Sequence, residues 1–273
     1  MHPILFQFKT PDFLQGFLAD TITVYTYGAF IAFGALLGAL YTGIRAKKEL
    51  GVPYYVINNL LLLILITAFL GGKLFFYFEN PGYYFGQPAN MIKDPGKGFV
   101  FYGSLIFSVT AIIIFFKIKK IPTLKMLDII AITTCIVHFF GRLGCFNAGC
   151  CYGHVHEGIF SVIFTNPVCM ARPLNTPLHP TQLYSAAMIL TIFVVLMVVK
   201  NRKSFDGQVF LLYIMLYASG RAIVETFRGD LIRGFIVDEY LSHSQFIAAI
   251  LFIIAAIFYF QLKKNAPSRS IKT

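Results

Sequence analysis

Seven long apolar runs constrain this chain more than any other feature of its sequence. Each run is close to the roughly 20 residues that a helix needs to cross a bilayer. The chain is 57% hydrophobic and only 13% charged, whereas a soluble domain carries about 25% charged residues. We therefore expect an all-α membrane protein with about seven transmembrane helices, forming a single domain over residues 1–273. The predicted spans are Ile22–Thr42, Val56–Phe78, Phe99–Phe116, Met126–Phe146, Leu183–Val199, Gln208–Phe227 and Gln245–Leu262.

The basic residues between the spans predict the orientation of the chain. The net charge is +11, but Lys and Arg gather in short clusters between apolar runs, which argues against binding of nucleic acid. Fourteen Lys and Arg residues lie at the span ends on one predicted side of the membrane, and six lie at the span ends on the other side. Because cytoplasmic loops carry the excess of Lys and Arg, we expect the N-terminus outside and the C-terminus in the cytoplasm. Residues 79–98 and 147–182 are then outer loops. Residues 1–21 are interpreted as an interfacial arm without a cleavable signal peptide.

Ionisable residues inside the predicted spans are the next signal, since a charge in hydrocarbon is costly and usually marks a function or a pair. They are Lys73, Arg142, Arg221 and Glu225, and Tyr27 and Tyr102 lie at the same predicted depth in the outer half of the bilayer. Two guanidinium groups at headgroup depth favour binding of a phosphate, because each offers planar bidentate donors. Glu225 follows Arg221 by four residues and shares its helix face, so it would orient the arginine or act as a base. Snorkelling to the interface or structural ion pairing is the alternative.

Four segments concentrate small and polar residues at the predicted outer ends of the spans. In residues 138–153, glycines permit close backbone approach and positive-φ turns where the helix ends. Residues 179–184 open the fifth span with a proline, which fits a first turn that needs no amide donor. The other two segments are residues 101–105 and 219–228. Each segment alone is equally well explained as an ordinary helix end.

Taken together and in this order, the segments resemble the prolipoprotein diacylglyceryl transferase family over nearly the whole chain. The resemblance rests on Tyr27-Gly28, Gly71-Gly72-Lys73, Gly103, Gly141-Arg142-Leu143-Gly144 with Gly153, His179 to Tyr184, Arg221 to Arg228 and Ser244-Gln245. It implies transfer of diacylglycerol from phosphatidylglycerol to the lipobox cysteine of a prolipoprotein signal peptide, with a thioether formed and glycerol phosphate released. It also implies a bacterial cytoplasmic membrane location, an active site towards the outer leaflet and no cofactor.

The resemblance and the depth of the charges together give the expected site. The expected catalytic residues are Arg142, Arg221, Glu225, Tyr102 and His138. The expected substrate-binding residues are Tyr27, Lys73, Gly103, Cys145, Gly153, His179, Gln182 and Tyr184. The expected partners are phosphatidylglycerol, the prolipoprotein signal peptide and membrane lipids.

The chain departs from the family pattern at several polar positions. Tyr102 replaces a histidine, Ser104 a glycine, Cys145 an asparagine, Cys150 a glutamate, Ser185 a glutamate and Lys73 an arginine. The identity of the general base is therefore open, and the candidates are Tyr102, His138 and Glu225. A phenol with a pKa of about 10 is a poor base at neutral pH. His138 lies one helical turn before Arg142 and faces the same way, although a histidine bonded to a neighbouring helix is an equal alternative.

The five cysteines allow several interpretations. Cys135 lies mid-span and is interpreted as packing, whereas Cys145, Cys150 and Cys151 lie at the outer end of the fourth span. Thiolates and imidazoles bind zinc, but the spacing matches no standard pattern, and no metal site is predicted. A disulfide fits an oxidising outer face, with Cys169 as a candidate partner. Buried free thiols are the third interpretation.

Other functions fit parts of the pattern. A divergent relative that acts on another lipid or acceptor fits the replaced polar residues, as does a non-catalytic lipid-binding or thiol-redox membrane protein. An anion transporter fits the intramembrane charges. Transporters, however, often carry internal repeats and broken helices at the midplane, and this sequence has no clear repeat and no proline inside its spans.

Overall fold

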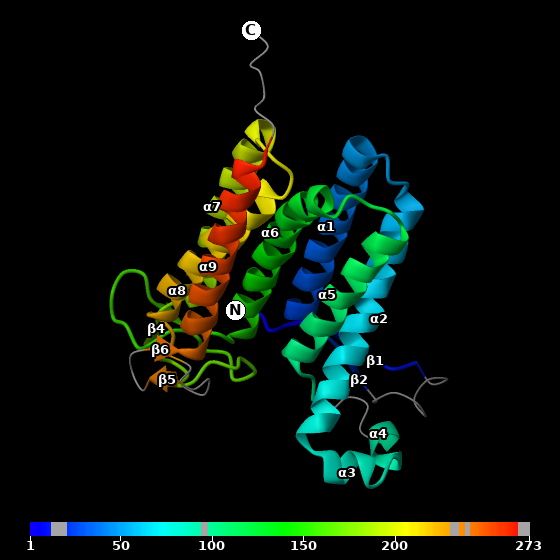
Figure 1. Ribbon diagram of the computed structural model, residues 1–273. Coiled ribbons are helices and arrows are strands. Elements are labelled where there is room, and N and C mark those ends of the chain that lie inside the picture. The colour runs from blue at the N-terminus through cyan, green and yellow to red at the C-terminus, as the bar shows by residue number, and fades with distance from the viewer. Residues whose placement is uncertain (12–20, 94–97, 230–234, 238–240, 267–273) are drawn as a thin grey trace. The chain divides into compact units, whose positions relative to one another are not determined.

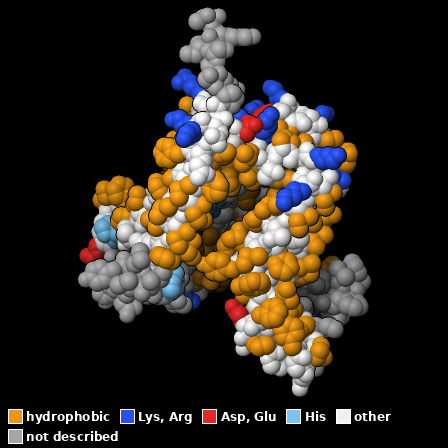
Figure 2. All heavy atoms as spheres, in the orientation of Figure 1, with side chains coloured by type: hydrophobic (Ala, Val, Ile, Leu, Met, Phe, Trp, Pro, Cys, Tyr) orange, Lys and Arg blue, Asp and Glu red, His pale blue; other side chains and the backbone are white. Residues whose placement is uncertain are grey.

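The predicted helices are present in the structure, a computed structural model that describes residues 1–11, 21–93, 98–229, 235–237 and 241–266. Seven helices within these ranges are long and apolar enough to cross a membrane. They are α1 (Thr26–Leu50), α2 (Tyr54–Glu79), α5 (Phe101–Ile118), α6 (Thr123–Ala148), α7 (Thr181–Arg202), α8 (Gln208–Glu225) and α9 (His243–Lys264) (Figure 1). Hydrophobic side chains cover much of their lateral faces, as a lipid-exposed surface requires (Figure 2). The prediction of a mainly helical membrane protein with seven spans is therefore confirmed.

The ends of the helices differ from the predicted spans. The first span was predicted to begin at Ile22, which is wrong, because Thr21–Tyr25 form strand β2. This strand pairs antiparallel with β1 (Ile4–Lys9), and its β-branched residues suit an extended backbone. Residues 12–20 of the expected interfacial arm lie outside the described residues. At its other end α1 continues to Leu50 through basic residues. A hydropathy criterion excludes these residues from a predicted span, but positive charges are favourable near a helix C-terminus.

The chain divides into two compact units. Unit 1 contains Met1–Leu40 and Leu127–Thr273, and unit 2 contains Tyr41–Met126. The expected single domain stays a prediction.

Unit 2 is built on the packing of α2 against α5. The backbones of Gly71 and Gly103 approach so closely that a Cβ on Gly71 would lie 2.4 Å from the Gly103 carbonyl oxygen. Ser104 Oγ donates to the Ala68 carbonyl oxygen at 2.7 Å, which joins the same two helices. Small residues at such a crossing are how membrane helices gain van der Waals contact. Two short helices, α3 (Pro81–Phe85) and α4 (Ala89–Lys93), follow α2 in the expected outer loop.

Unit 1 contains a second glycine-mediated crossing and a three-helix layer. Gly34 and Gly38 of α1 lie against α6, where added Cβ atoms would come within 2.8 Å of Phe140 and Val137 side-chain carbons. Helix α8 packs against both α7 and α9. Two further strand pairs lie in this unit. They are β3 (Val162–Ile163) with β4 (Pro177–Leu178), and β5 (Phe235–Val237) with β6 (Leu241–Ser242).

A buried carboxylate in unit 1 fixes the start of α8. Asp128 on α6 is 2% exposed, and its oxygens accept the backbone N–H groups of Gly207 and Phe210, each at 3.0 Å. Lys203 Nζ donates to the same carboxylate at 2.9 Å. Burial lowers the pKa of Lys203, but the hydrogen bonds and charges of Asp128 and then Asp206 raise it more, so the net shift is upward. Asp128 thus satisfies amides that the first turn of a helix leaves without partners.

We expect Asp128→Asn to destabilise the folded protein by about 1–3 kcal/mol, the usual cost of a weakened hydrogen bond to a buried charged group. An amide keeps one acceptor for the α8 amides but no longer pairs with the Lys203 charge. Thermal unfolding of the detergent-solubilised protein measures the loss. Asp206→Asn is the matched control, because Asp206 is 42% exposed in its own pair with Lys203. Equal stability of the two variants would contradict the role of Asp128.

Candidate functional site

One face of α6 carries three of the expected site residues at its C-terminal end. His138, Arg142 and Cys145 are spaced by four and three residues, so they form a stripe along one side of the helix. Arg142 Nε donates to His138 Nε2 at 3.2 Å. Among the described residues no carboxylate lies within ion-pair distance of Arg142. Its positive charge is therefore not neutralised by the described part of the chain.

The C-terminal end of α8 carries a partly buried charge triad. Arg221 Nη1 is in direct ion contact with Glu225 Oε2, and the Arg228 Nε is 4.0 Å from the same oxygen. The side chains are only 12%, 9% and 6% exposed in chain order. The expectation that Arg221 and Glu225 share a helix face is confirmed. One carboxylate thus faces two guanidinium groups, and the triad keeps a net positive charge.

A ring contact joins the two cationic helix ends. His138 of α6 lies 5.3 Å from Tyr217 of α8, measured between ring centroids. Arg142 comes one turn after His138 and Arg221 one turn after Tyr217. Both guanidinium groups lie close enough to His138 to influence it electrostatically. The structure therefore brings together Arg142, Arg221, His138 and Glu225, four of the five expected catalytic residues.

The N-terminal turn of α1 covers the same end of α6. Gly144 is buried, and an added Cβ there would lie 3.1 Å from the Tyr27 ring and 3.2 Å from its carbonyl oxygen. Tyr27 itself is 41% exposed. Arg142 and the thiols of Cys145, Cys150 and Cys151 all lie within electrostatic reach of its hydroxyl group. Tyr27 is thus next to the stripe that contains Arg142.

The start of α7 is hydrogen-bonded to the segment that follows α6. Gly153 donates its N–H to the His179 carbonyl oxygen at 2.9 Å, and a Cβ on Gly153 would lie 2.4 Å from the Phe227 carbonyl oxygen. Gln182 is fully buried, and its Nε2 donates to the Cys150 carbonyl oxygen at 2.7 Å. Its Oε1 has no hydrogen-bond partner among the described residues. Gly153 and Gln182 therefore hold backbone segments together in this structure.

Two other expected binding residues line an apolar cavity of about 550 Å³ between α7 and α8. His179 Nδ1 lies 3.0 Å from Tyr184 Oη, and the His179 ring stacks on His156 at 3.9 Å between centroids. Burial, and then the neighbouring His156 and His154, hold the pKa of His179 below its usual range. A neutral ring fits this stacked position. The remaining walls are mostly aliphatic and aromatic, among them Phe227.

Three expected residues lie in unit 2. Lys73 is buried, and its Nζ donates to the Gly98 carbonyl oxygen at 3.2 Å. Gly103 is buried in the α2–α5 crossing, and Tyr102 is 59% exposed beside Phe101. Their expected contacts with substrate stay predictions.

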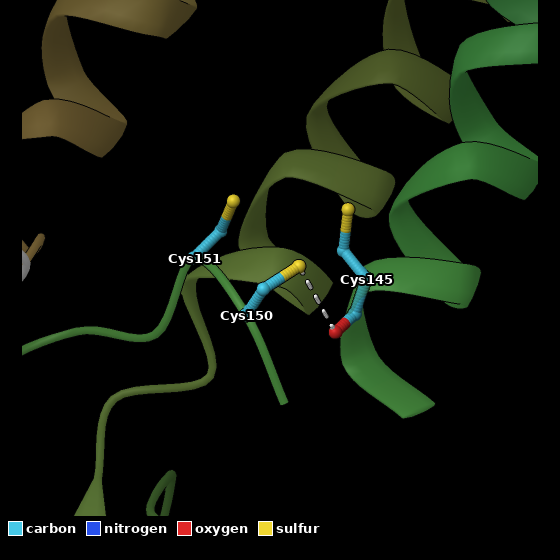
Figure 3. A group of neighbouring side chains, drawn as sticks. All are labelled: Cys145, Cys150 and Cys151. Carbon is cyan, nitrogen blue, oxygen red and sulfur yellow. Dashed lines mark hydrogen bonds between the residues drawn. The ribbon is translucent and has the colours of Figure 1, made fainter. Parts of the chain in front are cut away.

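Sequence reasoning used Arg228 as part of the motif Arg221 to Arg228 but did not include it among the expected site residues. In the structure Arg228 is buried, and residues 153 and 228 form an isolated antiparallel bridge. A signal was present, because Arg228 follows Glu225 by three residues, a spacing at which helical or turn side chains meet. Cys151 was named with its two neighbouring cysteines, but the convergence of these three residues was not predicted. Figure 3 shows Cys145, Cys150 and Cys151 together, with the Cys150 thiol donating to the Cys145 carbonyl oxygen at 3.8 Å.

The fold and this site define a class of multi-span membrane proteins with paired arginines at one end of the helices, suited to the headgroup of an anionic lipid. The family model of prolipoprotein diacylglyceryl transferase matches residues 17–261. The chain therefore belongs to the prolipoprotein diacylglyceryl transferase family, and the resemblance noted in its sequence is confirmed.

Curated relatives agree with this assignment. The chain is 37% identical over 243 residues to a phosphatidylglycerol–prolipoprotein diacylglyceryl transferase of Clostridium tetani, covering 89% of this chain and 94% of the relative. It is 29% identical to a second such transferase of Clostridium perfringens, with 89% and 92% covered. A Dehalococcoides mccartyi transferase is 26% identical, with 89% and 91% covered.

Proposed function

We propose that this chain transfers the diacylglyceryl group of phosphatidylglycerol to the lipobox cysteine of prolipoproteins. The cysteine sulfur forms a bond to the glyceryl carbon, the carbon–oxygen bond to phosphate breaks, and glycerol phosphate leaves. Membership of the family supports this reaction, as do the names of the Clostridium relatives, which specify both substrates. The observation that carries the proposal at the level of residues is the pair Arg142 and Arg221, one turn beyond the contact of His138 with Tyr217.

The two arginines bind and stabilise the phosphate. Arg142 has no carboxylate partner among the described residues, so its charge is available to an anion. Arg221 is held in place by Glu225. As the carbon–oxygen bond breaks, the phosphate gains a second negative charge. Preorganised donors aimed at that developing charge are the largest single contribution in many enzymes.

The apolar cavity next to His179 and Tyr184 accommodates an acyl chain of the donor lipid. Its walls come from α7 and α8 and from residues 156 and 160, so it lies within the same unit as the arginines. Because an acyl chain in the bilayer is already in an apolar environment, the cavity would hold it by van der Waals contact with its aliphatic and aromatic walls. Anchoring one chain there would hold the headgroup at a fixed depth relative to the arginines.

The protein lies in the bacterial cytoplasmic membrane with the arginines towards the outer leaflet. In each unit, Lys and Arg side chains gather at the ends of the helices that the sequence assigns to the cytoplasm (Figure 2). The N-terminus and the outer loops then lie on the side from which a prolipoprotein's mature part emerges. This orientation rests on the excess of positive charge on cytoplasmic loops.

None of the three candidate bases stands ready to accept a proton. His138 Nε2 already accepts the hydrogen bond from Arg142 Nε, and Glu225 is ion-paired with Arg221 and Arg228. Tyr102 carries a phenol, a group that is generally a poor base at neutral pH. Their roles as base stay predictions. A free cysteine has a pKa of about 8.5, so deprotonation of the acceptor thiol needs either another activating group or only modest assistance.

The proposal is tested with vesicles that contain phosphatidylglycerol labelled in its acyl chains and a lipobox peptide. We expect label on the peptide and glycerol phosphate in solution in equal amounts. A peptide with serine in place of the lipobox cysteine is the control and should stay unlabelled. Absence of label on the cysteine peptide, together with failure to complement a strain depleted of its own transferase, would overturn the proposed reaction.

A further inference from the structure

Three cysteine thiols converge at the C-terminal end of α6. The sulfur atoms of Cys145, Cys150 and Cys151 all lie within 4.8 Å of one another. Cys145 comes from the last turn of α6, and the other two come from the segment after it (Figure 3). All three side chains are only partly buried, so a further group can reach the sulfur atoms. The structure contains no disulfide among the described residues.

The backbone turn that gathers these thiols is unusual. Gly149 and Cys151 both have positive φ angles, of 72° and 60°. A non-glycine residue in this region costs energy and persists where the surrounding structure demands it. Neighbouring side chains hold the turn in place. Gln182 Nε2 donates to the Cys150 carbonyl oxygen at 2.7 Å, and Thr181 Oγ1 donates to the Cys151 carbonyl oxygen.

The spacing of the sulfur atoms suits a zinc ion. Zinc–thiolate bonds are about 2.3 Å long, which places the sulfurs of a tetrahedral site about 3.8 Å apart. All three sulfur atoms lie within 4.8 Å of one another, so side-chain rotations that shorten a separation by at most about 1 Å reach that geometry. Three thiolates and Zn²⁺ carry a net charge of minus one, and Arg142 and Arg228 both lie within electrostatic reach of Cys151. Thiolates are soft ligands that select zinc over the hard cations magnesium and calcium.

We infer that Cys145, Cys150 and Cys151 bind Zn²⁺ through three thiolates and leave its fourth position for the thiol of the acceptor peptide. The inference rests on the proposed function. Catalytic zinc sites characteristically have three protein ligands and one open position. A thiol that coordinates zinc loses its proton outright. This supplies the activation that the hydrogen-bonded His138 and the ion-paired Glu225 are poorly suited to give.

The reaction balances with this ion in place. The acceptor thiol releases its proton to water when it coordinates. Its sulfur then forms the bond to the glyceryl carbon, while the electron pair of the broken carbon–oxygen bond leaves with glycerol phosphate. Cys145 follows Arg142 by three residues on one face of α6. The nucleophile and the leaving phosphate are thereby held on neighbouring positions of the same helix.

Metal analysis of the purified full-length protein tests the ion itself. After zinc is supplied and excess metal is removed, we expect one zinc per chain in the wild type. The Cys145→Ser and Cys150→Ser variants should lose it, whereas Cys135→Ala should keep it, because Cys135 is buried in the middle of α6. A metal-free wild type, or variants that keep their zinc, would overturn the site. So would a disulfide between two of the three cysteines, detected as the loss of two hydrogen masses.

Cobalt spectroscopy tests the open position. In Co²⁺-substituted protein, a lipobox peptide should add a thiolate charge-transfer band, and the same peptide with serine at the lipobox position should not. No added band would overturn coordination of the acceptor. Label transfer in the vesicle assay by metal-free protein would overturn the zinc role while leaving the proposed transferase function intact. Zinc binding without any label transfer would instead overturn that function, so the two failures are distinguishable.

Discussion

Replacement of Arg142 by alanine is expected to lower kcat for diacylglyceryl transfer by about 10²–10³, which corresponds to a loss of about 2.7–4 kcal/mol of transition-state stabilisation. Arg142 has no carboxylate partner among the described residues, so its charge is not neutralised by an ion pair with a described residue. Its side chain contacts His138, and removal of the guanidinium also frees that ring. The rate of diacylglyceryl transfer is measured with phosphatidylglycerol vesicles and a lipobox peptide.

Two further variants separate charge from geometry at this position. Arg142→Lys should fall between wild type and alanine, because an ammonium group keeps the charge but not the planar pair of donors. Arg202→Ala is the matched control, since Arg202 is exposed at the far end of α7, and it should transfer at the wild-type rate. An Arg142→Ala protein that is folded and as fast as Arg202→Ala would exclude Arg142 from phosphate binding.

The sequence predicts the helices well because a single physical requirement, burial of about 20 apolar residues in hydrocarbon, determines each of them. It fails where another preference competes. Thr21–Tyr25 is apolar enough to extend the first span, yet its β-branched residues pair with Ile4–Lys9 as strands. That pairing joins two segments separated along the chain, and hydropathy alone contains no information on such a contact.

The candidate site, like the fold, could be predicted from the sequence only in part. The ion pair of Arg221 with Glu225 follows from their spacing of four residues on one helix. The convergence of Cys145 with Cys150 and Cys151 does not follow from spacing, because it depends on a turn with two positive φ angles. The role of Asp128 is equally hidden, since its backbone partner Gly207 is 79 residues further along the chain.

Loss of the carboxylate at position 225 is expected to have the largest effect on stability. Glu225 lies between Arg221 and Arg228, and all three side chains are nearly buried. Glu225→Ala leaves two cations without their shared partner, and removing one member of a buried ion pair costs about 3–5 kcal/mol. Thermal unfolding in detergent measures the change. Glu157→Ala is the control, because Glu157 is exposed in the loop after α6, and equal unfolding temperatures for the two variants would contradict this expectation.

Glu225→Gln separates a positioning role from a role as base. Glutamine keeps an oxygen acceptor for Arg221 but cannot take up a proton at neutral pH, so a catalytic base would be lost completely. Because Glu225 is already ion-paired with two guanidinium groups, we expect it to position Arg221. The glutamine variant should then show a raised KM, since Arg221 is held less firmly, while the pH dependence of kcat keeps its wild-type shape. Disappearance of the acidic limb of that profile in Glu225→Gln would identify Glu225 as the base instead.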